Sequence, residues 1–162
     1  MILLVCGYDR SGKDAVAETI ADTLDGQVAN TSTWIIEHAR EWCGWTDYDD
    51  AWIKIHQRDT LRNIGDSVTA VHPEFLFDTA LNQLAPDCGL GIVTGIRHKA
   101  ELDAVRDGCD GVIWVQRNHP DVQRGNCDLD VGCADHVITN DGTLEELQGK
   151  AHAMARQLSY VG

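Results

Sequence analysis

Short apolar runs alternate along the chain with stretches whose apolar residues recur at helical spacing. The run Ile2–Cys6 is continuously apolar and ends at Gly7, which is the pattern of a strand buried on both faces. Further apolar runs predict strands over 90–94, 112–115 and 136–139. Helical spacing and helix-boundary residues predict helices over 13–24, 33–42, 51–64, 73–84 and 99–106, and a last one from Thr143. Strands that alternate with helices predict an α/β fold with a mainly parallel sheet flanked by helices.

The chain is predicted to form a single domain over 1–162, because no repeat, low-complexity tract or linker-like segment divides it. The segment 118–134 has no periodicity and is long for a connection, so we expect a functional loop there. The last predicted helix opens on a capping box, in which Thr143 and Glu146 satisfy each other's backbone donors.

The balance of charge narrows the range of partners. The 162 residues carry 13 Lys plus Arg against 26 Asp plus Glu, a formal net charge of −13. Nucleic acids and anionic membranes attract proteins through a basic face, so this charge argues against both, but not against a small anion in a local basic pocket. Six scattered cysteines without a C-x-x-C pair predict reduced thiols. With no leader-like or membrane-spanning apolar stretch, we expect a cytoplasmic protein without a membrane partner.

One motif indicates specific chemistry. The sequence G-Y-D-R-S-G-K-D over 7–14 follows the first predicted strand and opens the first helix, with the G-x-x-x-x-G-K spacing of a phosphate-binding loop (P-loop). Its glycines let backbone N–H groups converge on phosphate oxygens at a helix N-terminus, and Lys13 neutralises the β- and γ-phosphates. The alternative is a turn whose glycines have only a structural role. We expect ATP to be bound by Gly7, Arg10, Ser11, Gly12, Lys13 and Asp14.

Asp14 stands where Ser or Thr usually completes this motif. A carboxylate binds Mg²⁺ directly or through water, as the usual hydroxyl does, so we expect Asp14 to hold Mg²⁺. The alternative is an acid that only favours the helix N-terminus.

A second group of cations predicts a second anion site. Lys54, Arg58 and Arg62 lie four residues apart, so they project from one face of a continuous helix. Asp50 and Asp59 could pair with them and produce an ordinary solvated face instead. We assign Arg58 and Arg62 to the phosphate of an acceptor substrate, because guanidinium forks suit bidentate phosphate recognition.

Three further arginines complete the predicted site. Arg97 follows the strand 90–94 at its carboxyl end, where α/β sheets bind ligands. Arg117 and Arg124 belong to the long loop region and could close over the transferring phosphoryl group as a lid. We expect Arg97 to bind phosphate, Arg97 and Arg117 to act in catalysis with Lys13, and Arg124 to contact the substrate.

Four blocks of sequence carry a family resemblance. They are G-x-x-x-x-G-K-D over 7–14, L-R-N-I-G-D over 61–66, I-V-T-G-I-R-H-K-A-E-L over 92–102 and A-D-H-V-I-T-N-D-G-T-L-E-E-L over 134–147. In this order they resemble the bacteriophage-type deoxynucleoside monophosphate kinases, a branch of the P-loop nucleotide kinases. One departure is Gly95, which stands where that family has an Asp that would support Mg²⁺.

The resemblance implies a fold and an activity. The fold would be the three-layer P-loop nucleotide kinase fold, with a helical acceptor-binding region at about 33–85 and a lid at about 118–134. The activity would be transfer of the γ-phosphoryl group of ATP, with Mg²⁺, to a deoxynucleoside 5′-monophosphate, giving the diphosphate. If the protein is encoded by a phage, its location would be the host cytoplasm, and a homodimer is compatible with the sequence.

Two other functions stay open at this point. A phage DNA-modification kinase would phosphorylate a hydroxymethyl-pyrimidine base in DNA and would use Asp9 to deprotonate the hydroxyl, although the net charge counts against DNA binding. A catalytically inactive nucleotide-binding regulatory protein is consistent with Gly95. Cys127, Cys133 and His136 could also hold zinc in the loop, but their spacing matches no standard zinc pattern.

Overall fold

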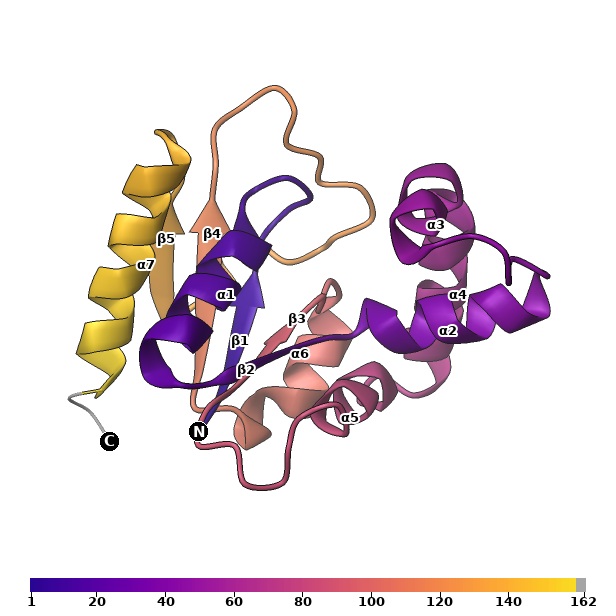
Figure 1. Ribbon diagram of the computed structural model, residues 1–162, viewed down its shortest axis with the longest axis horizontal. Helices are drawn as coiled ribbons and strands as arrows, with labels where there is room; N and C mark the ends of the chain where they lie inside the picture. The colour runs from indigo at the N-terminus through magenta and orange to yellow at the C-terminus, as the bar shows by residue number, and fades with distance from the viewer. Residues whose placement is uncertain (160–162) are drawn as a thin grey trace.

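The computed structural model describes residues 1–159 and has a twisted sheet at its centre (Figure 1). The sheet has five strands in the order β2-β3-β1-β4-β5, and all neighbouring strands are parallel. In its register, Leu4 lies between Val93 and Val112 of the two adjacent strands. The predicted parallel α/β sheet is therefore confirmed. The strands are β1 (Ile2–Cys6), β2 (Gln27–Asn30), β3 (Gly91–Thr94), β4 (Gly111–Gln116) and β5 (His136–Thr139).

Helices cover both faces of the sheet (Figure 1). α1 and α7 lie on one face, α5 and α6 lie on the other, and α2, α3 and α4 extend past the edge of the sheet. The helices are α1 (Lys13–Leu24), α2 (Ser32–Trp42), α3 (Asp50–His56), α4 (Arg58–Val71), α5 (Phe75–Leu81), α6 (Lys99–Val105) and α7 (Leu144–Ser159).

The apolar run of β1 is buried on both sides, as its sequence predicts. Leu3 and Val5 belong to the core formed with α1 and α7. Leu4 and Cys6 belong to the core formed with α5 and α6. Because successive strand residues point to opposite faces, an unbroken apolar run is what a strand between two helical layers requires.

The sequence pattern does not predict strand β2. Only Ala29 of its four residues is buried, while Gln27 and Val28 are exposed and Asn30 is polar. An edge strand of this length has neither an apolar run nor a full alternation, so its identity depends on pairing with β3. Its carboxyl end brings Asn30 to the edge of the sheet where the P-loop lies.

The prediction of one continuous helix over 51–64 is wrong. Its residues form nearly all of α3 and the first half of α4. The two helices separate at Gln57, whose φ of −118° and ψ of 24° depart from helical values. Neither Pro nor Gly marks this break, so the sequence carries no local signal for it. α4 also continues to Val71, and the helix expected over 73–84 is shorter, as α5.

The starts of α7 and α3 are marked by capping residues that lie next to them in the sequence. The Thr143 N–H donates to Glu146 Oε2 at 2.7 Å, and the Glu146 N–H donates to Thr143 Oγ1 at 3.2 Å, so the predicted capping box is confirmed. Asp49 caps α3 by accepting the Trp52 N–H at 2.7 Å. Within 1–159, no helix is both long enough and apolar enough to cross a membrane.

Candidate functional site

The P-loop connects the carboxyl end of β1 to the N-terminus of α1. Gly12 precedes the helix with a φ of +94°, a left-handed conformation that favours glycine. A Cβ at this position would lie 2.6 Å from Asn140 Nδ2 and 3.0 Å from Leu147 Cδ2. The second glycine of the motif is therefore required both by its backbone conformation and by close packing.

Asn140 directly follows β5 and holds the P-loop through a hydrogen bond. Its side-chain amide donates to the Ser11 carbonyl at 2.8 Å, and the residue is only 8% exposed. We did not predict a role for Asn140. The available signal is a polar residue placed directly after a strand, at the edge of the sheet where the carboxyl ends of the strands meet.

Replacing Asn140 with Asp tests this support. Asp has nearly the same shape, but its carboxylate has no N–H and would face the Ser11 carbonyl. We expect a cost of about 1–3 kcal/mol, seen as a fall of about 2–12 °C in the melting temperature and a weaker affinity for ATP by calorimetry. Asn82→Asp, at an exposed position, is the matched control. An unchanged melting temperature and ATP affinity in Asn140→Asp would contradict the role.

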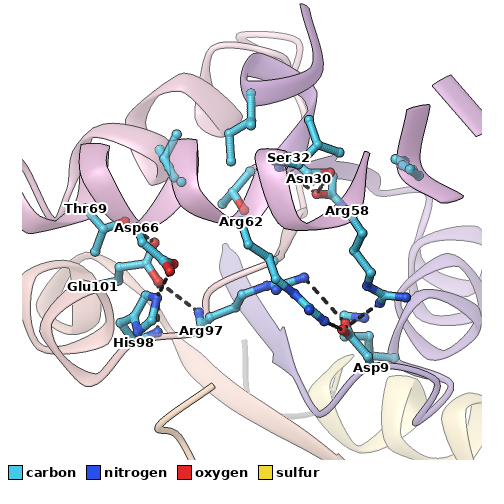
Figure 2. Close-up of a pocket in the computed structure, with 18 of the residues that line it drawn as sticks. Asp9, Asn30, Ser32, Arg58, Arg62, Asp66, Thr69, Arg97, His98 and Glu101 are labelled. Carbon is cyan, nitrogen blue, oxygen red and sulfur yellow. Dashed lines mark hydrogen bonds and ion pairs between the residues drawn. The ribbon is translucent and has the colours of Figure 1, made fainter. Parts of the chain in front are cut away.

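A pocket of about 500 Å³ opens beside the P-loop (Figure 2). It lies between the carboxyl ends of β2 and β3 and the helices α2, α3 and α4. Seven of the predicted site residues line it, namely Asp9, Arg10, Lys13, Asp14, Arg58, Arg62 and Arg97. Lys54 also lines the pocket, so the three basic residues spaced by four share one cavity although they belong to two helices.

Three arginines converge on Asp9 of the P-loop (Figure 2). Asp9 Oδ2 lies 2.6 Å from Arg58 Nη2 and 3.1 Å from Arg62 Nη2, and Asp9 Oδ1 lies 3.4 Å from Arg97 Nη2. Burial by itself would raise the pKa of Asp9, but the neighbouring positive charges, that of Arg97 first, outweigh it and lower the pKa below its usual value. Asp9 is therefore held as a carboxylate among cations.

The other two predicted arginines lie outside this pocket. Arg117 Nη1 donates to the Arg10 carbonyl of the P-loop at 3.1 Å. Arg124 Nε donates to the Cys127 carbonyl at 3.0 Å, and its guanidinium lies 5.8 Å from the centre of the Tyr8 ring. Arg124 borders a small cavity next to the P-loop, which shares Asp9, Lys13 and Arg97 with the large pocket.

The end of the pocket away from the P-loop is lined by polar residues that we did not predict. Glu101 is 2% exposed, and its Oε2 accepts the backbone N–H groups of Arg97 and His98, both at 2.9 Å. Glu101 Oε1 accepts the Thr69 hydroxyl at 3.1 Å. Glu101 thus fixes the chain that carries Arg97. The signal available in the sequence is an acid in the first turn of the helix predicted after this strand.

Gly95 stands where the resembled family has an acid, and the structure leaves no room for a side chain there. Its φ is +103°, and a Cβ there would clash with the Thr31 hydroxyl and lie 3.2 Å from Asn30 Oδ1. The Asn30 amide instead donates to Thr94 Oγ1 at 2.9 Å, and Asn30 Oδ1 accepts the Ser32 N–H at 2.8 Å. Polar residues from the end of β2 therefore occupy the space beside Gly95.

Asp14 has the chemistry that Mg²⁺ needs. Its side chain is 65% exposed on the first turn of α1, lines the pocket, and lies 3.9 Å from Lys13 Nζ. In residues 1–159 no three His, Cys, Asp or Glu side chains are grouped so as to hold a metal ion, which gives the predicted zinc alternative no site there. Mg²⁺ usually takes one or two carboxylates together with phosphate oxygens and water, so a single exposed acid beside the P-loop fits it.

The long loop over 118–134 lies against the site. Asp9 and Gln123 exchange backbone hydrogen bonds of 3.0 and 3.1 Å, and Asp128 N donates to the Arg97 carbonyl at 3.1 Å. Gly125 lies next to the Arg62 guanidinium, 3.2 Å from Nη2 to the position of a Cβ. These contacts hold the loop beside the P-loop and α4, and its movement as a lid stays a prediction.

The protein matches known proteins in its three-dimensional structure. No protein-family model and no curated protein sequence matches it. Shikimate kinase from Aquifex aeolicus matches over 100% of both chains, with a TM-score of 0.57 and 14% identity. TT1252 from Thermus thermophilus matches over 100% of this chain and 98% of its own, with a TM-score of 0.56 and 17% identity. A gluconokinase from Sinorhizobium meliloti 1021 matches over 97% and 91%, with a TM-score of 0.52 and 12% identity. The chain therefore has the three-layer P-loop kinase fold, in which helices flank a parallel sheet.

Proposed function

We propose that the protein transfers the γ-phosphoryl group of ATP to the 5′-phosphate of a deoxynucleoside monophosphate. The observation that carries this proposal is the convergence of Arg58, Arg62 and Arg97 on one point beside the P-loop. Two of the solved structures with this fold are described as kinases, of shikimate and of gluconate, which supports the wider class of phosphotransferases acting on small molecules.

The charge at this point suits an acceptor phosphate. Three guanidinium groups face one carboxylate, so two positive charges are in excess, and these match a phosphate dianion. Each guanidinium has five N–H donors, and the contacts to Asp9 use one Nη2 from each arginine. Arg62 Nη1 also contacts Asp59 Oδ1 at 3.4 Å, and Arg62 Nε is buried. The other donors of Arg58 and Arg97 have no partner within residues 1–159, so they are available for bidentate binding of phosphate oxygens.

Phosphoryl transfer in this pocket depends on positioning and charge. The P-loop amides and Lys13 would bind the β- and γ-phosphates of ATP, and the arginines would direct an acceptor phosphate oxygen at the γ-phosphorus. A bond forms between that oxygen and the γ-phosphorus as the bond from phosphorus to the β–γ bridging oxygen breaks, which releases ADP. When bound, Mg²⁺ would neutralise charge on the phosphate oxygens, and Asp14 would hold it.

The state of Asp9 favours a phosphate acceptor over a hydroxyl acceptor. A hydroxyl needs a base to take its proton, whereas an acceptor phosphate is already anionic. The lowered pKa of Asp9 makes it a weak base, and three arginines occupy its oxygens. This arrangement weighs against the DNA-modification alternative, in which Asp9 deprotonates a hydroxymethyl group.

ADP release in the presence of ATP and Mg²⁺ tests the proposal. We expect turnover with at least one of dTMP, dGMP, dCMP and dAMP, and none in the same preparation without acceptor. Transfer of labelled γ-phosphate to hydroxymethylated DNA, but not to any mononucleotide, would favour the DNA-modification kinase. ATP binding without turnover on any acceptor would favour the regulatory protein.

A further inference from the structure

We propose that Asp66 selects acceptors whose base, like cytosine and adenine, carries an amino group where uracil and hypoxanthine carry a carbonyl. The inference rests on the proposed function and concerns the end of the same pocket that lies away from the P-loop. Asp66 is on α4, one turn after Arg62, and lines the pocket. Its carboxylate would accept a hydrogen bond from the base of a nucleotide whose phosphate lies among the arginines.

The two ends of the pocket differ in chemistry (Figure 2). Asp9 and the three arginines lie at one end, and Asp66, Thr69, His98 and Glu101 lie together at the other. The apolar side chains of Ile35, Leu61 and Leu76 also line the pocket, and they give it surface for a flat ring. A pocket of about 500 Å³ is in the range for ligands of nucleotide size.

Two side chains hold the Asp66 carboxylate in place. His98 Nε2 lies 3.0 Å from Asp66 Oδ1, and Asn126 Nδ2 lies 2.6 Å from Oδ1 and 2.7 Å from Oδ2. Asn126 comes from the long loop and His98 from the start of α6, so the carboxylate is fixed between separate elements. A fixed carboxylate discriminates better than a mobile one, because its position does not adapt to the ligand.

Asp66 keeps capacity for one more donor. A carboxylate offers about four acceptor positions, and the contacts within residues 1–159 use two on Oδ1 and one on Oδ2. The side chain is 43% exposed and lines the pocket, so the carboxylate is accessible to a ligand there. The neighbouring acid, Glu101, is almost fully buried and already accepts three hydrogen bonds, which leaves Asp66 as the accessible acid at this end.

Which bases Asp66 accepts depends on whether the group that faces its carboxylate is a hydrogen-bond donor. The amino group of cytosine or adenine can donate to Asp66 Oδ2. The carbonyl oxygen that replaces it in uracil or hypoxanthine has no proton to give and would meet a negative charge. The ring N–H next to that carbonyl is one position away, and the Asp66 carboxylate, held by His98 and Asn126, would have to shift to accept it. A hydrogen bond to a charged partner contributes about 1.5–3 kcal/mol, which corresponds to about a 10- to 150-fold preference for the amino-bearing base.

Two matched pairs of acceptors test the inference: dCMP against dUMP, and dAMP against dIMP. We expect kcat/KM to be at least about tenfold higher for the amino member of at least one pair, mainly through KM. Asp66→Asn, which presents both a donor and an acceptor, should reduce that ratio to about threefold or less. Asp22→Asn, at an exposed position on α1, is the control and should keep the wild-type ratio.

The outcomes separate this inference from the proposed function. Turnover of both members of each pair at equal kcat/KM overturns the inference and leaves the kinase proposal standing. A wild-type ratio retained in folded Asp66→Asn also overturns it. If no nucleotide is turned over, the proposed function fails, and the same pairs compared by calorimetry decide the inference: tighter binding of the amino member supports it, and equal or absent binding overturns it.

Discussion

Replacing Lys13 with alanine is expected to lower kcat/KM about a thousandfold or more while the protein stays folded. The Lys13 side chain is 16% exposed, follows the P-loop glycine and lines the pocket. Its charge would act on phosphate oxygens as negative charge moves toward the leaving ADP, and single cations in this role contribute about 10³- to 10⁵-fold. The measurement is steady-state ADP release with the preferred acceptor, accompanied by thermal unfolding.

Lys99→Ala is the matched control for this variant. Lys99 is an exposed cation on α6 that pairs with Asp103 at 2.9 Å, so its loss removes the same charge without touching the pocket. We expect its kcat/KM to stay within about twofold of wild type, as exposed pairs contribute little. A folded Lys13→Ala protein with wild-type kcat/KM would show that the P-loop is not the donor site.

The second large effect is expected from Arg62→Lys, which keeps the charge but removes the guanidinium fork. Arg62 is the least exposed of the three arginines around Asp9, at 21%. Lys carries a point charge on a flexible stem and cannot bind two phosphate oxygens in parallel. We expect the KM for the acceptor to rise about 30- to 100-fold, which corresponds to about 2–3 kcal/mol, with the KM for ATP changed by less than about threefold.

The comparison variant is Arg156→Lys, at an exposed position in the last turn of α7. Both KM values should stay at the wild-type level in this protein. An equal rise in the two KM values of Arg62→Lys would place the residue in general support of the pocket. A rise for ATP alone would assign the arginine group to the donor and contradict the proposed arrangement.

Local sequence patterns predict most of the strands and helices of the fold. β1, α1 and the capping box of α7 all depend on residues adjacent in sequence, and each is confirmed. The sequence predicts neither β2 nor the break at Gln57, for a common reason. A short edge strand and a helix break without Pro or Gly are set by the neighbours on which they pack, and no periodicity records those neighbours.

The residues of the candidate site also fall into two groups, those that the sequence indicates and those that become evident from their contacts in the structure. Lys13, Arg58, Arg62 and Arg97 could be chosen from the sequence, because cations are scarce in an acidic chain and those that follow strands or repeat along helices stand out. Asn140 and Glu101 carry only weak signals, their places after a strand and in a first helical turn, and Asp66 carries none. Acidic and amide side chains are common here, and what distinguishes these three is the partner that each one contacts.

The sequence by itself determined the P-loop, because its glycines, its lysine and the flanking strand and helix are one continuous segment. Only the tertiary structure decided what faces it. Arg62 and Arg97 are separated from Asp9 by 53 and 88 positions, yet both contact its carboxylate. Such contacts arise when parallel strands bring their carboxyl ends to one edge of the sheet and α4 packs beside it. The position of the anion site is therefore a property of the packed chain, while the residue types that build it are already present in the sequence.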